Sequence, residues 1–88
     1  MENMNMQERI VDLAWHDKIS LPQAKALEQL NKEGYNVEPA LKGRIVGFSN
    51  TMLMIKMVKE NDEEGIAKLI AETEEAEKYL KETFPDLY

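Results

Sequence analysis

Hydrophobic residues recur at helical spacing near the start of the chain. The residues that share one face are Met6, Ile10, Leu13 and Ala14. Their spacing predicts a helix over residues 4–17. Trp15, the only tryptophan, lies beside this face. We expect it to be a partly buried core residue, with an exposed interface residue as the alternative.

The second helix is predicted from signals at both of its ends. Ser20 is a suitable N-cap, and Gln23 three residues later completes a capping box. Gly34 suits the left-handed conformation that ends many helices, and Tyr35 would then pack back against the last turn. Together these signals predict a helix over residues 21–33.

The middle of the chain allows two interpretations. Its apolar positions follow the spacing of a helix that packs along a second helix. These positions are Leu41, Ile45, Phe48, Met52 and Ile55. We predict a helix over residues 39–60 and expect these five side chains to form the seam through which two copies associate. The alternative is a β-hairpin over residues 44–59, because Gly43 and Gly47 each cost about 1 kcal/mol inside a helix. The same glycines favour close approach of another helix.

The last helix is predicted over residues 63–83. Asp62 is a natural N-cap, and acidic residues follow it in the first turn, where the helix dipole favours negative charge. Its apolar face consists of Ile66, Leu69, Ile70, Thr73, Ala76 and Leu80. Phe84 ends the helix because the residue before a proline avoids the helical conformation. The pattern therefore predicts a single all-α domain of about four helices over residues 1–88.

Composition narrows the class of protein. A chain of 88 residues buries a small core, and without cysteine it has no disulfide to support it. We therefore expect a homodimer. No signal peptide and no membrane span is apparent, so we expect a cytoplasmic protein that does not interact with membranes. We expect no metal and no cofactor, because there is one histidine, no thiolate ligand and no phosphate-binding loop.

Charge is distributed unevenly along the chain. The net charges of residues 1–38, 39–59 and 60–88 are −3, +4 and −7. An anionic ligand should therefore meet the middle segment. Its cations are Lys42, Arg44, Lys56 and Lys59, and Tyr35 or Phe48 could stack on unpaired bases beside them. Nucleic-acid binding, with RNA or single strands favoured, is the alternative function.

No group of residues indicates catalysis. Asp12 and His16 have the spacing of two metal ligands on a helix, but no second histidine or cysteine exists to complete a site. We interpret them as a weak pair on a solvated face. The two serines, Ser20 and Ser49, do not lie in a nucleophile motif. We therefore predict a protein that is not an enzyme.

In length, in its acidic run over residues 60–64 and in its methionine-rich middle, the chain resembles the small acidic early proteins by which lytic bacteriophages redirect their hosts. The resemblance covers the whole chain and assigns no site residues. It implies a dimer that binds a host protein or a nucleic acid. Our leading prediction is accordingly a regulatory protein that binds a host or cellular protein.

Overall fold

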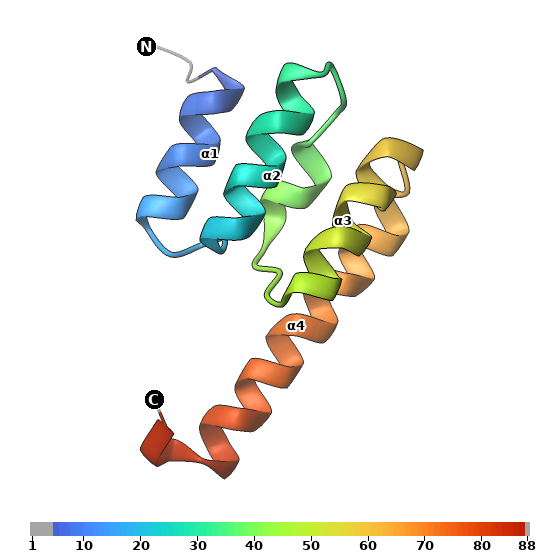
Figure 1. Ribbon diagram of the computed structural model, residues 1–88. Helices are drawn as coiled ribbons and strands as arrows, with labels where there is room; N and C mark the ends of the chain where they lie inside the picture. The colour runs from blue at the N-terminus through green and yellow to red at the C-terminus, as the bar shows by residue number, and fades with distance from the viewer. Residues whose placement is uncertain (1–4, 88) are drawn as a thin grey trace.

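Helices make up most of the computed structural model, which describes residues 5–87 (Figure 1). In chain order they are α1 (Met6–Trp15), α2 (Leu21–Lys32), the 3-10 helix η1 (Glu38–Lys42), α3 (Phe48–Glu60), α4 (Glu63–Thr83) and the 3-10 helix η2 (Pro85–Leu87). No residue in the described range is in a strand, so the all-α prediction is confirmed and the hairpin alternative is wrong. α1, α2 and α3 lie side by side, and α4 crosses behind α3 and runs out past the other helices (Figure 1).

The predicted caps of α2 are confirmed by its hydrogen bonds, and the helix ends at Lys32, one residue before its predicted end. The Ser20 hydroxyl accepts from the Gln23 N–H at 3.3 Å, and the Gln23 Oε1 accepts from the Ser20 N–H at 3.3 Å. At the other end Gly34 has a φ of +94°, and the Tyr35 N–H donates to the Leu30 carbonyl at 3.1 Å. These bonds satisfy terminal backbone groups that a helix cannot pair internally.

Both ends of α4 also match the prediction. The Asp62 carboxylate accepts from the Gly65 N–H at 3.0 Å, and the helix ends at Thr83. α1 is shorter than predicted. The start that we placed at residue 4 lies outside the described residues, and the helix ends at Trp15 instead of residue 17. Asp17 adopts a left-handed φ of 58° in the turn to α2.

Residues 39–60 do not form the predicted continuous helix. η1 ends at Lys42, a non-helical segment follows, and α3 begins at Phe48. Gly43 lies so close to α4 that a Cβ atom there would collide with the Ile70 side chain, which confirms the predicted close approach of another helix for Gly43 but not for Gly47. Gly47 has a φ of +97°, a conformation that side-chain-bearing residues rarely adopt. Glycine is therefore required at these two positions for different reasons, close packing at Gly43 and backbone conformation at Gly47.

Gln23 holds the break in place from the neighbouring helix. Its side chain is completely buried. Its amide nitrogen donates to the Ala40 carbonyl at 3.0 Å and to the Gly43 carbonyl at 2.9 Å, and its amide oxygen accepts from the Ile45 N–H at 2.8 Å. One side chain thus satisfies backbone groups that a continuous helix would have paired internally.

The core is formed by all four α-helices, η1 and the segments between them. Its fully enclosed side chains include Ile10, Leu27, Ile45, Met54 and Ile66. Every buried residue among those described lies between Ile10 and Thr73, so the end of α4 takes no part in the core. None of the helices in residues 5–87 combines the length and the apolar content needed to cross a membrane.

Candidate binding surfaces

The outer face of α1 carries an exposed aromatic side chain, Trp15. Ile10 points into the core, and Leu13 and Ala14 pack partly against it. α1 packs on the core along one face only. Val11 and Trp15, which follow Ile10 and Ala14 in the sequence, lie outside that face and are exposed to solvent. The Trp15 side chain is 83% exposed, so the prediction of a partly buried core residue is wrong.

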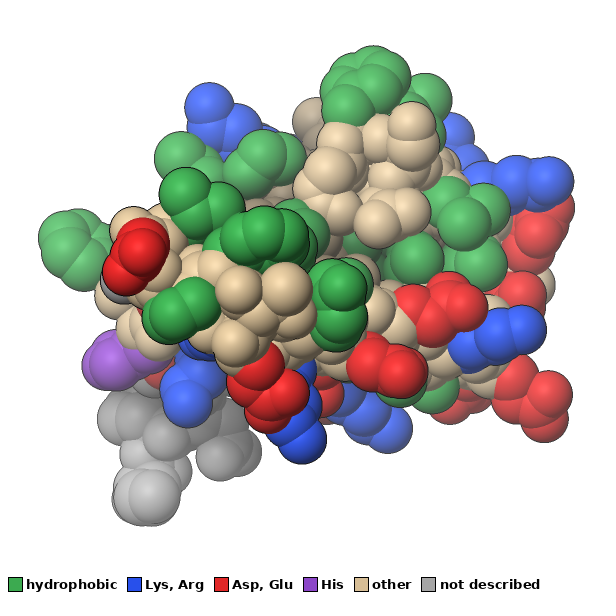
Figure 2. Space-filling model, turned by 90° about the horizontal axis from the view of Figure 1, so that it is seen from below, with side chains coloured by type: hydrophobic (Ala, Val, Ile, Leu, Met, Phe, Trp, Pro, Cys, Tyr) green, Lys and Arg blue, Asp and Glu red, His purple; other side chains and the backbone are tan. Residues whose placement is uncertain are grey.

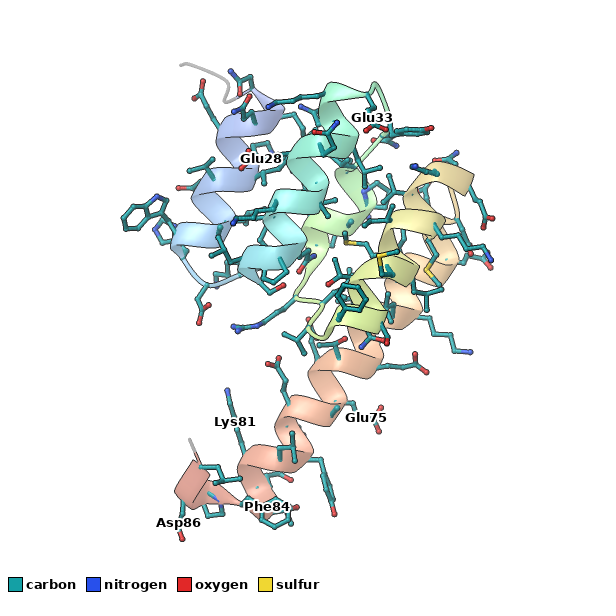
Figure 3. The ribbon with its side chains drawn as sticks, viewed as in Figure 1. Glu28, Glu33, Glu75, Lys81, Phe84 and Asp86 are labelled. Carbon is teal, nitrogen blue, oxygen red and sulfur yellow. The ribbon has the colours of Figure 1, made fainter. Side chains whose placement is uncertain are left out.

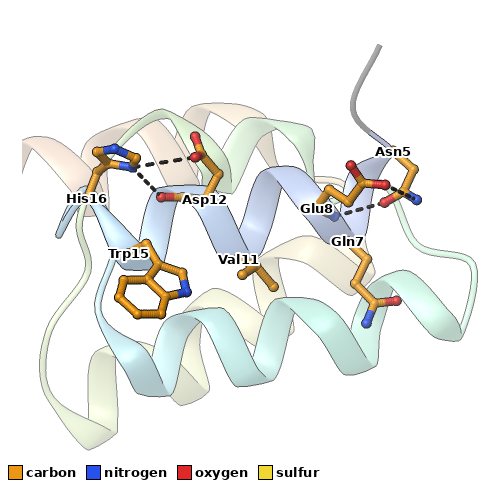
Figure 4. Close-up of a pocket in the computed structure, with 7 residues that line it drawn as sticks. All are labelled: Asn5, Gln7, Glu8, Val11, Asp12, Trp15 and His16. Carbon is orange, nitrogen blue, oxygen red and sulfur yellow. Dashed lines mark hydrogen bonds and ion pairs between the residues drawn. The ribbon is translucent and has the colours of Figure 1, made fainter. Parts of the chain in front are cut away.

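Val11 and Trp15 lie in a shallow depression of about 660 Å³, which we call the α1 surface (Figure 4). Among the described residues, those that line it come from the stretch Asn5 to His16. The Asn5 side chain caps α1 by accepting from the Glu8 N–H at 2.8 Å, and its amide donates to the Glu8 carboxylate at 2.9 Å. The depression is thus built on a capped helix.

The polar edge of the α1 surface is acidic. The His16 Nδ1 donates to the Asp12 backbone carbonyl at 2.9 Å and lies 3.5 Å from the Asp12 carboxylate. The carboxylates of Glu8 and Asp12 are both accessible, so the edge presents negative charge beside the indole. Within residues 5–87 no cluster of three or more side chains is arranged to hold a metal ion.

The residues predicted to form a self-association seam do not share a surface. Leu41 and Ile45 are buried inside the subunit, with Ile45 at 0% exposure, so this part of the prediction is wrong. Ile55 is half-buried against the core. Phe48 and Met52 are exposed on the first turns of α3, where Phe48 is 83% accessible. The seam fails because the helix that would have aligned these residues is broken at residues 43–47.

The predicted cationic residues are divided between two parts of the molecule. Arg44 lies 3.1 Å from the Asp17 carboxylate and 3.6 Å from the Glu77 carboxylate, so it is largely engaged by acidic neighbours. Lys59 lies 5.9 Å from the centre of the Tyr35 ring, near the opposite end of α3. Since α3 has 13 residues, about 20 Å of helix separates these two places. Lys42 and Lys56 are both exposed, and nucleic-acid binding stays a prediction.

The end of α4 and η2 form a second apolar surface, which we call the arm (residues 74–87). No residue of the arm is buried. Its large apolar side chains are Tyr79, Leu80, Phe84 and Leu87, all exposed. Figure 2 looks onto the end of the molecule where the arm projects and shows hydrophobic side chains in the open beside acidic groups. The sequence carried part of the signal for this surface, because the apolar face of the predicted last helix extends to Leu80.

Comparisons of this chain with protein-family models, with curated proteins and with solved structures each gave no match.

Proposed function

We propose that this protein is a non-catalytic, homodimeric regulator that binds another protein through the α1 surface. The observation that carries the proposal is the exposure of Trp15 on a capped helix. Tryptophan is enriched among the residues that dominate binding energy in protein interfaces. Val11 widens the apolar contact, and the depression around both residues offers room for a partner side chain.

The chemistry of the α1 surface favours a basic partner segment. An arginine or lysine side chain can lie on the face of the indole, where the ring attracts a cation. The carboxylates of Glu8 and Asp12 lie beside Val11 and Trp15 and can pair with the same cation. The net charge of −6 would also steer a basic partner towards the protein and repel an acidic one.

Trp15 provides a direct test, because it is the only tryptophan in the chain and lies at the proposed contact. Its fluorescence should be titrated with a 16-residue amphipathic helical peptide that carries leucine on one face and arginine on the other. We expect the emission to shift to shorter wavelength as the indole leaves water. A peptide of the same design with glutamate in place of arginine should cause no shift. Equal response to both peptides, or to neither, would contradict the proposal.

Two variants and a control define the surface by calorimetry with the same arginine peptide. Trp15→Ala should weaken binding at least tenfold, since truncation of a dominant interface residue typically costs about 2 kcal/mol or more. Asp12→Lys should weaken it through charge. Phe48→Ala removes a side chain of equal exposure from another surface and should leave binding unchanged.

The nucleic-acid alternative is separated by a titration with a single-stranded RNA oligonucleotide. Binding that weakens steeply with salt and is lost in the Lys42→Glu, Arg44→Glu double variant would overturn the proposal in favour of a nucleic-acid ligand. On the proposed function we expect no binding of the oligonucleotide at low salt, because the α1 surface is acidic.

A further inference from the structure

The apolar face of α4 continues past the point where the body of the protein ends. Ile66, Leu69 and Thr73 are buried in the core. The next positions of the same 3-4 spacing are Ala76 and Leu80, and both are exposed. The apolar pattern of α4 therefore continues beyond the part of the helix that is buried in its own subunit. Such a pattern is typical of a helix that packs along another element. A short helical segment without tertiary packing is only marginally stable in water, so the arm is suited to being covered.

We propose that the arm pairs antiparallel with the arm of a second copy of this chain, about a two-fold axis at Leu80. The inference rests on the homodimer in the proposed function and names its surface. In such a pair, residues equally far before and after Leu80 lie opposite each other. Ala76 of one copy therefore faces Phe84 of the other, which places a small side chain against a large one, as well-packed helices require.

The structure has a place for the Phe84 ring of the second copy. Ala76 and Leu80 line a hollow of about 230 Å³ together with Val46 and Asn50, where the arm leaves the body. Phe84 itself is 48% exposed on the arm. The two-fold operation brings each Phe84 to the hollow of the other copy, so both exposed rings are covered in one contact.

Charge favours the antiparallel direction over the parallel one. Glu77 and Lys81 lie four residues apart on the same edge of the apolar face, and Glu72 lies on the opposite edge. In an antiparallel pair like edges meet, so Glu77 of each copy, which also lies 3.6 Å from Arg44 of its own subunit, approaches Lys81 of the other. In a parallel pair opposite edges meet, and Glu72 would approach Glu77 twice. The attraction in the first arrangement and the repulsion in the second select the antiparallel pair.

The size of the surface indicates a reversible dimer. Tyr79 and Phe84 are 61% and 48% exposed. A fully buried aromatic side chain covers about 200 Å², so the exposed parts of these two side chains together amount to about 200 Å². Leu80 and Leu87 add to this, but the arm stays below the about 800 Å² per partner of a standard interface. We therefore expect association to depend on protein concentration within the range accessible to sedimentation.

Site-specific cross-linking tests the register, because the chain has no cysteine of its own. Leu80→Cys places one thiol on each side of the two-fold axis and should form an intermolecular disulfide under mild oxidation. Glu75→Cys is the matched control, since Glu75 and Lys81 extend to opposite sides of α4 (Figure 3) and an axis at Leu80 would place the two copies of Glu75 about 15 Å apart along the helices. It should remain largely uncross-linked. Equal cross-linking of both variants would overturn the register.

Sedimentation equilibrium tests the pairing and its direction. Wild-type protein should shift from monomer to dimer as its concentration rises. Leu80→Asp should abolish the shift, and Leu21→Asp, at an exposed site on α2 away from the arm and its hollow, should not. Glu77→Lys should weaken the dimer at least threefold, and Lys81→Glu in the same chain should restore it. A stronger dimer for Glu77→Lys alone would indicate parallel arms and overturn the proposal.

The outcomes also separate this inference from the rest of the proposed function. A dimer that Leu80→Asp leaves intact would overturn the arm but not the homodimer. A monomer at every concentration would overturn both. Loss of peptide binding at the α1 surface would overturn the binding role and leave the arm pairing standing, because the two surfaces share no residue.

Discussion

At the scale of single residues, Gln23 shows how one side chain can have a local and a long-range function. The sequence predicted its part in the capping box with Ser20, because that interaction depends on a spacing of three residues. Its contacts with Ala40, Gly43 and Ile45 join positions 17 to 22 residues apart, and no local pattern indicates them. A polar residue in a buried helix position is the one sign that the sequence offers, since such groups are rarely enclosed without partners.

Replacing this residue tests its role in stability. Gln23→Leu keeps a similar volume but leaves the two carbonyls and one N–H of the 40–45 segment without their partners. Each buried polar group left unsatisfied costs about 1–3 kcal/mol, so we expect a loss of about 3 kcal/mol or more in the free energy of unfolding. Gln29→Leu, on the exposed face of the same helix, is the control and should change stability by less than about 0.5 kcal/mol. Equal effects of the two substitutions, measured by urea unfolding, would contradict this role.

At the scale of helices, the sequence predicted those elements whose limits are set locally. The limits of α2 and α4 follow from caps at Ser20, Gly34 and Asp62, each acting within five residues of its partner. The prediction of a continuous helix over residues 39–60 was wrong because the contacts that hold its interruption come from distant parts of the chain. Ile70 requires a residue without a side chain at Gly43.

The conformation of Gly47 can be tested by Gly47→Ala, because the sign of the change in stability distinguishes a continuous helix from the observed fold. In a continuous helix over residues 39–60, Gly47→Ala would stabilise the protein by about 1 kcal/mol. In the observed fold Gly47 has φ 97° and ψ 143°, and alanine should cost about 1–3 kcal/mol there. Ala71→Gly, at an exposed position inside α4, should cost about 1 kcal/mol and shows that the assay detects helix propensity. A stabilised Gly47→Ala variant in thermal unfolding would favour the continuous helix.

At the scale of the whole molecule, the candidate surfaces could be predicted from the sequence only in part. Periodicity identified which face of α1 packs inward, but it could not say that the neighbouring residues Val11 and Trp15 would be left uncovered. That depends on how many elements surround the helix. The length of the apolar face of α4 was visible in the sequence, whereas the end of the body at Thr73 was not. The residues of the predicted self-association seam are all apolar, but the fold places some of them in the core and others on the surface.

The division of the molecule into a folded body and an arm predicts how a shortened chain behaves. A chain that ends at Lys78 keeps every residue that is buried within 5–87 and also keeps Glu77 beside Arg44. It loses the partly covered Leu80, which contributes less than about 2 kcal/mol. At a concentration where the full chain is a monomer, urea unfolding should therefore give nearly the same stability for both chains. At high concentration only the full chain should gain stability, because dimerisation stabilises the folded state by mass action. A shortened chain that is unfolded would instead make the arm part of the folding unit, since its packing would then be required for the body to hold together.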